Sequence, residues 1–211
     1  MELLIFDFDG TLGDSRRLIV TTMQETLAAL GLPVAGEAAC AATIGLPLEG
    51  CFFQLLNDEA LAAQCADLYR YELFPKNNVP GAVPPFPGVV ATLHELHRRG
   101  LELAVASSRA TPSLMQLLGD MDVLPLFSSV VSTLDVAQPK PAPDMVLKIL
   151  ADTAAKPSDT MMVGDATYDM LMGRAAGCAT CGVTYGNGTR EELARVADSL
   201  IDRFPDLLRL L

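Results

Sequence analysis

The stretch Leu3-Leu4-Ile5-Phe6-Asp7-Phe8-Asp9-Gly10-Thr11 joins an apolar run to two acids and a glycine. Four consecutive apolar residues predict a buried strand, and Gly10 predicts the turn that ends it. Asp7 and Asp9 lie two residues apart and should project to one side of the chain at the carboxyl end of this strand. Open sheets of parallel strands bind their ligands at that edge. An ordinary Asp-Gly turn after an edge strand is the alternative interpretation.

The two acids also set an electrostatic problem, because two carboxylates this close repel each other. The arrangement is stable if a cation neutralises the pair or if one carboxyl keeps its proton. Both solutions are useful in catalysis, so the two acids predict an active site as well as the end of a strand.

Further apolar runs recur along the chain and alternate with segments of helical periodicity. The predicted strands are Leu3–Phe6, Leu101–Ala106, Val130–Val131, Met161–Val163 and Gly182–Thr184. Helix ends are predicted at Gly31, Gly100 and Gly177. This alternation predicts an α/β fold, with a Rossmann-like parallel sheet and helices on both of its faces.

The interval between the first two predicted strands is too long for a single crossover. It shows only helical periodicity, notably in Leu48–Leu56 and Glu59–Phe74. Proline-rich segments at Val79-Pro80-Gly81 and at residues 84–88 predict the return to the sheet. We therefore interpret residues 16–82 as an inserted helical cap domain, and residues 1–15 and 83–211 as the α/β core domain.

Composition limits the possible partners and location. Half of the 211 residues are hydrophobic, which suffices for a well-buried core, and no apolar segment is long enough to span a bilayer. The net charge of −11 argues against nucleic acid and acidic membrane surfaces as partners. No secretion signal is visible and the five cysteines are scattered, which predicts a cytoplasmic protein with reduced thiols. Nothing in the sequence indicates an oligomeric state.

Polar residues follow the later predicted strands at three places. Ser107 and Ser108 follow the second strand, Lys140 lies between two prolines, and Asp165 with Asp169 follows Met161–Val163. Each has an ordinary interpretation of its own, as a helix cap or as a surface turn. Their order along the chain is more specific than any single member.

That order, Asp-x-Asp-Gly-Thr, Ser, Lys-Pro and Gly-Asp-x-x-x-Asp, resembles the haloacid dehalogenase superfamily of phosphohydrolases along the whole chain. Features that resemble its phosphoglycolate phosphatase and pyrophosphatase-like branch are residues 44–48, 87–89, 176–177, 183–186 and 188–193. Gly13 departs from the pattern, because many relatives carry a bulkier apolar residue there. We expect this glycine to loosen the hinge between core and cap.

The resemblance implies a Mg2+-dependent phosphatase that hydrolyses a small phosphorylated metabolite, phosphoglycolate-like, through an aspartyl-phosphate. Asp7 would be the nucleophile and Asp9 the general acid and base. The Asp7 carboxylate, the Asp9 backbone carbonyl and Asp165 would hold Mg2+, a cation that prefers oxygen ligands. Ser107 and Lys140 would neutralise the transferring phosphoryl group, and Asp169 would orient the site.

Six further residues are candidate substrate contacts: Thr11, Ser108, Arg109, Gly45, Leu46 and Glu49. For Arg109, a solvated position at a helix start is the alternative. The segment from Gly45 to Glu49 is expected to close over the core and choose the leaving group, although a plain interhelical turn is also possible.

Two other functions fit parts of the pattern. A phosphosugar mutase of the same fold would keep the core residues and exclude water from the phosphorylated aspartate. A non-enzymatic, phospho-accepting signalling domain would also use Asp, Mg2+ and Lys in a parallel sheet, but such domains lack an inserted cap.

Overall fold

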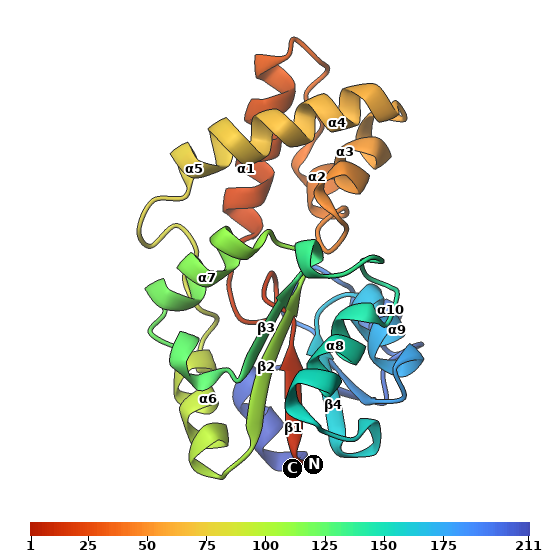
Figure 1. Cartoon of the computed structure of the whole chain (residues 1–211). Coiled ribbons are helices and arrows are strands. Elements are labelled where there is room, and N and C mark those ends of the chain that lie inside the picture. Colours follow the sequence, from red (N-terminus) through yellow and green to blue (C-terminus); the bar gives the residue numbers. More distant parts are fainter.

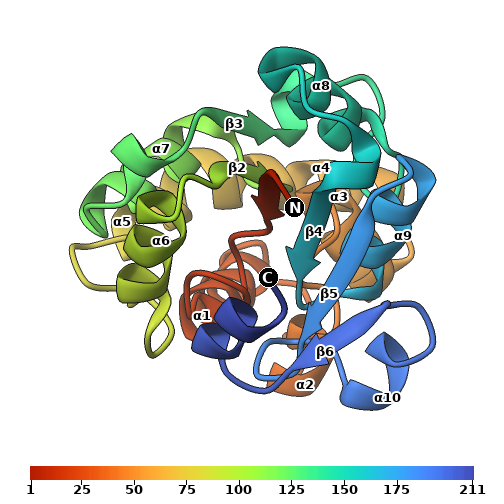
Figure 2. The same cartoon turned by 90° about the horizontal axis from the view of Figure 1, so that it is seen from below.

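The apolar run at the start of the chain forms the central strand of a six-stranded sheet. The computed structural model describes all 211 residues, and every neighbouring pair of strands in it is parallel. The strands are β1 (Leu3–Phe6), β2 (Glu102–Ser107), β3 (Ser129–Ser132), β4 (Thr160–Gly164), β5 (Ala179–Val183) and β6 (Ser199–Ile201). Their order in the sheet is β3-β2-β1-β4-β5-β6 (Figure 2). The predicted α/β fold class is confirmed.

The prediction was wrong at the end of the sheet that β5 and β6 form. Strand β5 begins at Ala179 and ends at Val183, whereas the sequence predicted Gly182–Thr184. Its first residues, Ala179-Thr180-Cys181, are small or polar and carry little apolar signal. Strand β6 was not predicted, because it is a three-residue strand at the edge of the sheet, too short for a period to show.

The chain has ten α-helices, and those after α5 lie around the sheet. The helices are α1 (Arg16–Ala29), α2 (Glu37–Ala41), α3 (Leu48–Leu56), α4 (Glu59–Leu68), α5 (Phe74–Asn77), α6 (Val89–Arg98), α7 (Thr111–Asp120), α8 (Asp144–Thr153), α9 (Thr167–Ala175) and α10 (Arg190–Leu193). Leu4 and Phe6 of β1 belong to a buried cluster that includes residues of α6 and α7. Leu3 and Ile5 belong to a second cluster, with residues of α8 and α9. Alternate side chains of one strand therefore serve two cores.

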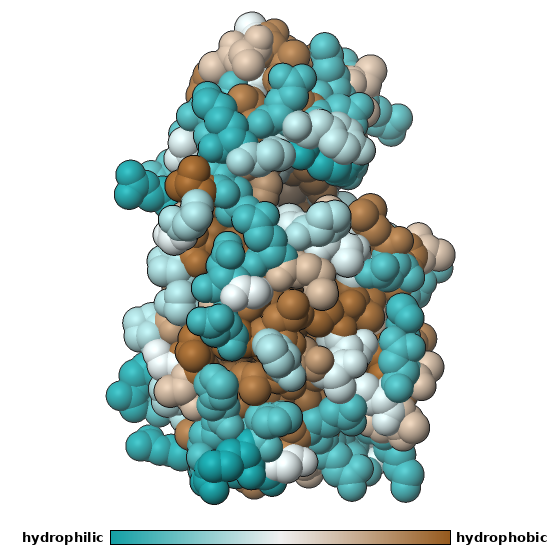
Figure 3. Space-filling view, turned by 60° about the vertical axis from the view of Figure 1, so that its left-hand side comes forward, coloured by the Kyte–Doolittle hydropathy of each residue, from teal (hydrophilic) through white to brown (hydrophobic).

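Helices α1 to α5, called the cap helices below, lie beyond the carboxyl ends of the strands, and both chain termini lie at the opposite end (Figure 1). The segment predicted as helical at Glu59–Phe74 runs from α4 through a π-helical turn, Tyr69–Leu73, into α5. The surface narrows between these helices and the part that contains the sheet (Figure 3). The boundaries of core and cap at residues 15/16 and 82/83 stay a prediction. No helix has the length and apolar character that crossing a membrane requires.

The two connections between sheet and cap helices lie side by side. The backbone N–H of Asp14 donates to the carbonyl of Pro84 at 2.8 Å, and that of Phe86 donates to the carbonyl of Leu12 at 3.0 Å. A Cβ atom on Gly13 would lie 2.9 Å from side-chain carbons of Phe8 and Val83. Gly13 therefore lets the two connections pack closely, so the structure does not support the expectation that this glycine loosens the hinge.

Candidate active site

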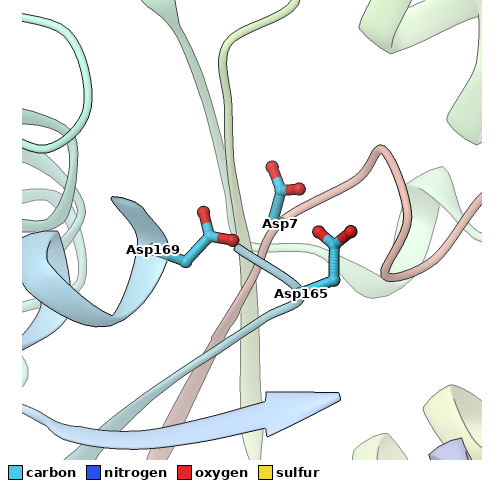
Figure 4. Close-up of side chains that lie close together, drawn as sticks. All are labelled: Asp7, Asp165 and Asp169. Carbon is cyan, nitrogen blue, oxygen red and sulfur yellow. The ribbon is translucent and has the colours of Figure 1, made fainter. Parts of the chain in front are cut away.

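Three predicted carboxylates converge at the carboxyl edge of the sheet. Asp7 directly follows β1, Asp165 directly follows β4, and Asp169 lies in the first turn of α9. All three are buried, and one oxygen of each lies within 4.8 Å of the others. In Figure 4 the Asp7 and Asp165 carboxylates project to the same side, and the Asp169 carboxylate points towards Asp7. Parallel strands end at a common edge, which explains why residues so distant in sequence meet here.

Lys140 lies between two of these carboxylates. Its Nζ donates to Asp7 Oδ1 at 2.6 Å and to Asp169 Oδ1 at 2.7 Å, and the side chain is 1% exposed. Burial alone would lower the pKa of Lys140, but the attraction of Asp169 and Asp7 outweighs it and raises the pKa above the usual range. Lys140 is therefore charged and is shared by two acids.

One lysine does not balance three buried carboxylates. Burial raises the pKa of Asp7 well above its usual range, with repulsion from Asp169 and Asp165 adding to it and Lys140 opposing it. Burial, then repulsion from Asp169, raises the pKa of Asp165 to about 7, against hydrogen bonds from Asn187. The site is thus short of positive charge, and its donors are carboxylate oxygens. A hard divalent cation fits such a donor set, with Asp7 and Asp165 as candidate ligands.

Asp165 is held by Asn187, which was not predicted as a site residue, and by Thr11, which was predicted as a substrate contact. The backbone N–H of Asn187 donates to Asp165 Oδ2 at 2.6 Å, and its Nδ2 donates to the same oxygen at 3.1 Å. Thr11 Oγ1 donates to Asp165 Oδ1 at 3.3 Å. A Cβ on Gly10 would overlap this carboxylate, so only glycine fits there. The signal for Asn187 was present as a Gly-Asn-Gly segment shortly after β5, which marks a close backbone approach.

Asp9 does not join this cluster and has a cation of its own. Arg109 Nε donates to Asp9 Oδ2 at 2.9 Å, and Arg109 Nη2 donates to Oδ1 at 2.6 Å. The hydroxyl of Ser15, which the sequence analysis did not select, also donates to Oδ1. The repulsion expected between Asp7 and Asp9 is thus relieved by two cations, Lys140 and Arg109.

Ser107, the last residue of β2, and Ser108, the residue after it, link the site to the cap helices. Ser107 is fully buried and its Oγ accepts a hydrogen bond from the backbone N–H of Arg109 at 3.2 Å. Ser108 Oγ donates to the carbonyl of Gly45 at 2.9 Å, which brings the loop before α3 against the core.

The other two candidate residues of that loop lie differently. Leu46 is partly buried against the large apolar cluster. Glu49 forms an ion pair with Arg70 at 2.6 Å, so its carboxylate is engaged within the cap helices. The substrate roles predicted for Leu46 and Glu49 stay predictions.

The raised pKa of Asp165 predicts how metal and pH act together on stability. Because the folded chain holds the Asp165 proton more tightly than the unfolded chain, metal-free stability should fall as the pH rises from about 4 to about 7. A divalent cation needs the deprotonated carboxylates, so it should stabilise the fold more at alkaline than at acidic pH. Thermal melts with Mg2+ or with chelator, from about pH 4 to about one unit above the pKa of Asp165, measure the difference. A stabilisation by Mg2+ that is equal at every pH would contradict the assignment.

Comparison with known proteins agrees with this geometry. The family model described as haloacid dehalogenase-like hydrolase matches residues 4–183. The chain is 39% identical to "Probable phosphatase IndB" of Dickeya dadantii over 98% of this chain and 91% of that protein. It is 31% identical to "Phosphoglycolate phosphatase" of Photorhabdus laumondii over 99% and 91% of the two chains. A crystal structure described as a predicted phosphatase from Clostridium acetobutylicum superposes with a TM-score of 0.90 at 28% identity, covering 99% and 97%.

These matches confirm the sequence-based prediction of a hydrolase of the phosphatase type. They cover both the sheet and the helices above it, so the likeness extends over the whole fold. The chain therefore belongs to the haloacid dehalogenase-like hydrolase family.

Proposed function

We propose that the chain is a Mg2+-dependent phosphatase that hydrolyses a small phosphorylated metabolite, phosphoglycolate-like, through an aspartyl-phosphate. The observation that carries the proposal is the buried cluster of Asp7, Asp165 and Asp169 around one lysine, Lys140. A carboxylate at a strand end, next to a fixed cation and a cation-deficient pocket, is suited to receive a phosphoryl group. The relatives named as phosphatases support the same reaction class.

In the first step, the Asp7 carboxylate attacks phosphorus and the bond from phosphorus to the ester oxygen breaks. Lys140 and Ser107 offset the charge on the transferring group, and Asp9 gives a proton to the departing oxygen. In the second step, Asp9 takes a proton from water, whose oxygen attacks phosphorus. Phosphate leaves and Asp7 is again a free carboxylate.

Bound Mg2+ would supply positive charge beside the phosphoryl oxygens, and Asp7 and Asp165 would hold it. The residues around these ligands are arranged to keep them in place. Asn187 and Thr11 fix both oxygens of Asp165, and Asp169 holds Lys140 and accepts from the backbone N–H of Ala166 at 3.0 Å. Such supporting hydrogen bonds typically tune metal affinity.

A phosphosugar mutase of the same fold is the second candidate function. It would use the same core but protect the phosphorylated Asp7 from water. Release of inorganic phosphate separates the two, because a mutase returns the phosphoryl group to a sugar. We propose a screen of phosphoglycolate, sugar phosphates, nucleotides and pyrophosphate, with Mg2+ and with chelator. Phosphate release from none of them would count against the proposal. The cytoplasmic location also stays a prediction.

Asp165→Ala should raise the Mg2+ concentration needed for half-maximal activity by more than roughly 10- to 100-fold, the usual cost of losing a residue that only supports a ligand, because here one of two candidate ligand carboxylates is itself lost. Activity is measured as a function of free Mg2+, with chelator expected to silence the wild-type protein. Asp120→Asn removes an exposed carboxylate from α7 and serves as the control. Persistent wild-type activity in excess chelator would show that the metal assignment is wrong.

Leu46→Ala combined with Glu49→Ala should change the ranking of preferred substrates while sparing a minimal aryl phosphate, which needs only the core residues. The reason is the contact of this loop with the core through Gly45 and Ser108. Relative kcat/KM values across the screen measure it. An equal loss on every substrate, or no change on any, would argue against the loop as a specificity element.

A further inference from the structure

Arg109 is unusually buried for an arginine of this chain. Its side chain is 8% exposed, whereas the side chains of the other arginines in ion pairs are between 29% and 78% exposed. Removing a guanidinium from water costs free energy unless it is paired and hydrogen-bonded. The groups that pair with Arg109 and offset this cost therefore indicate its function.

The guanidinium of Arg109 lies between the core and the cap helices. Besides its hydrogen bonds to Asp9, Arg109 Nη1 donates to Ser113 Oγ at 3.1 Å. Its central carbon lies 4.9 Å from the centre of the Phe74 ring, which α5 contributes, and 5.8 Å from the centre of the Phe8 ring. Aromatic faces hold a guanidinium in place without satisfying its donors, so Asp9 is the only acid bonded to it.

The place of Arg109 follows from the roles proposed above. Its backbone N–H bonds to Ser107, which is proposed to hold the phosphoryl group. Its side chain bonds to Asp9, which is proposed to protonate the departing oxygen. Arg109 therefore lies on the leaving-group side of the site. It would be next to the part of the substrate that is bonded to phosphorus through the ester oxygen.

We infer that Arg109 is a specificity residue that exchanges Asp9 for a carboxylate on the leaving group of the substrate. The inference rests on the proposed function. Arg109 and Ser15 occupy both oxygens of Asp9, so Asp9 must part from Arg109 before it can turn to the ester oxygen. A substrate carboxylate offers the guanidinium the same planar pair of oxygens that Asp9 offers now. A neutral substrate would leave a buried guanidinium without an acid, which is costly.

Within the phosphoglycolate-like substrates proposed above, Arg109 would therefore bind the carboxylate of the leaving group. The test compares kcat/KM for 2-phosphoglycolate with that for 2-hydroxyethyl phosphate, in which a neutral hydroxymethyl group replaces the carboxylate. The wild type should favour the first by about 30-fold or more, as expected for hydrogen bonds between charged groups. In Arg109→Gln the ratio should fall to about one, and Arg109→Lys should keep an intermediate preference. Effects on Asp9 act on both substrates and cancel in the ratio.

Arg99→Gln removes the same charge from an exposed ion pair with Glu95 and should leave the ratio unchanged. Thermal melts establish that each variant is folded, and Arg109→Lys provides the test if Arg109→Gln is not. A wild-type ratio near one, or a ratio that Arg109→Gln or Arg109→Lys leaves unchanged, would overturn the inference while the phosphatase proposal stands. If the wild type hydrolyses neither ester, calorimetric binding of 2-phosphoglycolate decides: binding that Arg109→Gln leaves unchanged overturns the inference, and its loss supports it.

Discussion

Asp7→Asn should reduce turnover by at least ~10⁴-fold, as loss of a catalytic nucleophile does in other enzymes that form covalent intermediates. The physical reason is that an amide cannot form the bond to phosphorus that the proposed mechanism requires. The fold should survive, because Asn is close in size to Asp and its side-chain oxygen can still accept the hydrogen bond from Lys140. Phosphate release in single and multiple turnover measures the loss.

Fluoroberyllate, which mimics a phosphorylated aspartate, adds a readout that does not depend on turnover. It should bind and stabilise the wild type in the presence of Mg2+ and should not bind Asp7→Asn. The exposed Asp120→Asn is the matched control and should behave as wild type. Full retention of phosphatase activity in Asp7→Asn would rule out the covalent mechanism.

Lys140→Met should lower the free energy of unfolding by ~3 to 5 kcal/mol, the usual cost of removing one partner from a buried ion pair. Methionine keeps most of the side-chain volume of lysine, so the loss of stability measures the removal of the positive charge. Asp7 and Asp169 would then face each other without the cation that both bind. Urea denaturation at neutral pH measures the effect, and turnover should be lost as well.

Two comparisons separate electrostatics from packing in this variant. Lys148→Met breaks an exposed pair with Asp152 and should cost less than ~1 kcal/mol. The loss of stability caused by Lys140→Met should be smaller at acidic pH. Protonation of Asp7 and Asp169 removes the repulsion between them, which Lys140 offsets in the wild type. A cost that is the same at acidic and neutral pH would point to packing instead.

The sequence predicted which residues gather at the edge of the sheet better than it predicted their partners. Asp7 and Asp165 follow strands, Asp169 begins the next helix and Lys140 lies in a proline-marked loop, and parallel strands end at one edge. The pairing of Asp9 with Arg109 was not predicted. This pairing depends on the conformation that the long side chain of Arg109 adopts in the folded protein. The spacing of residues along the sequence carries no information about that conformation.

The same limit applies to the parts of the fold that were missed. Strand β1 was clear because both of its faces are buried, so it is apolar throughout. Strand β6 pairs on one side only and has three residues, so its existence depends on the neighbour that it meets in the folded chain. Asn187 belongs to the same class, because its role depends on Asp165, which lies far from it in sequence.

The sheet order described above has a consequence for how the chain folds during synthesis. Strand β1 is made first, yet its neighbours are β2 and β4, and the latter begins only at Thr160. The first strand can therefore pair with β2 once about half of the chain has been made, but its other edge stays unpaired until β4 has left the ribosome. Helices α1 to α5 have no such delay, because their contacts are local in sequence. We expect the helical insertion to form first and the nascent β1 to be the segment most exposed to aggregation or to capture by chaperones.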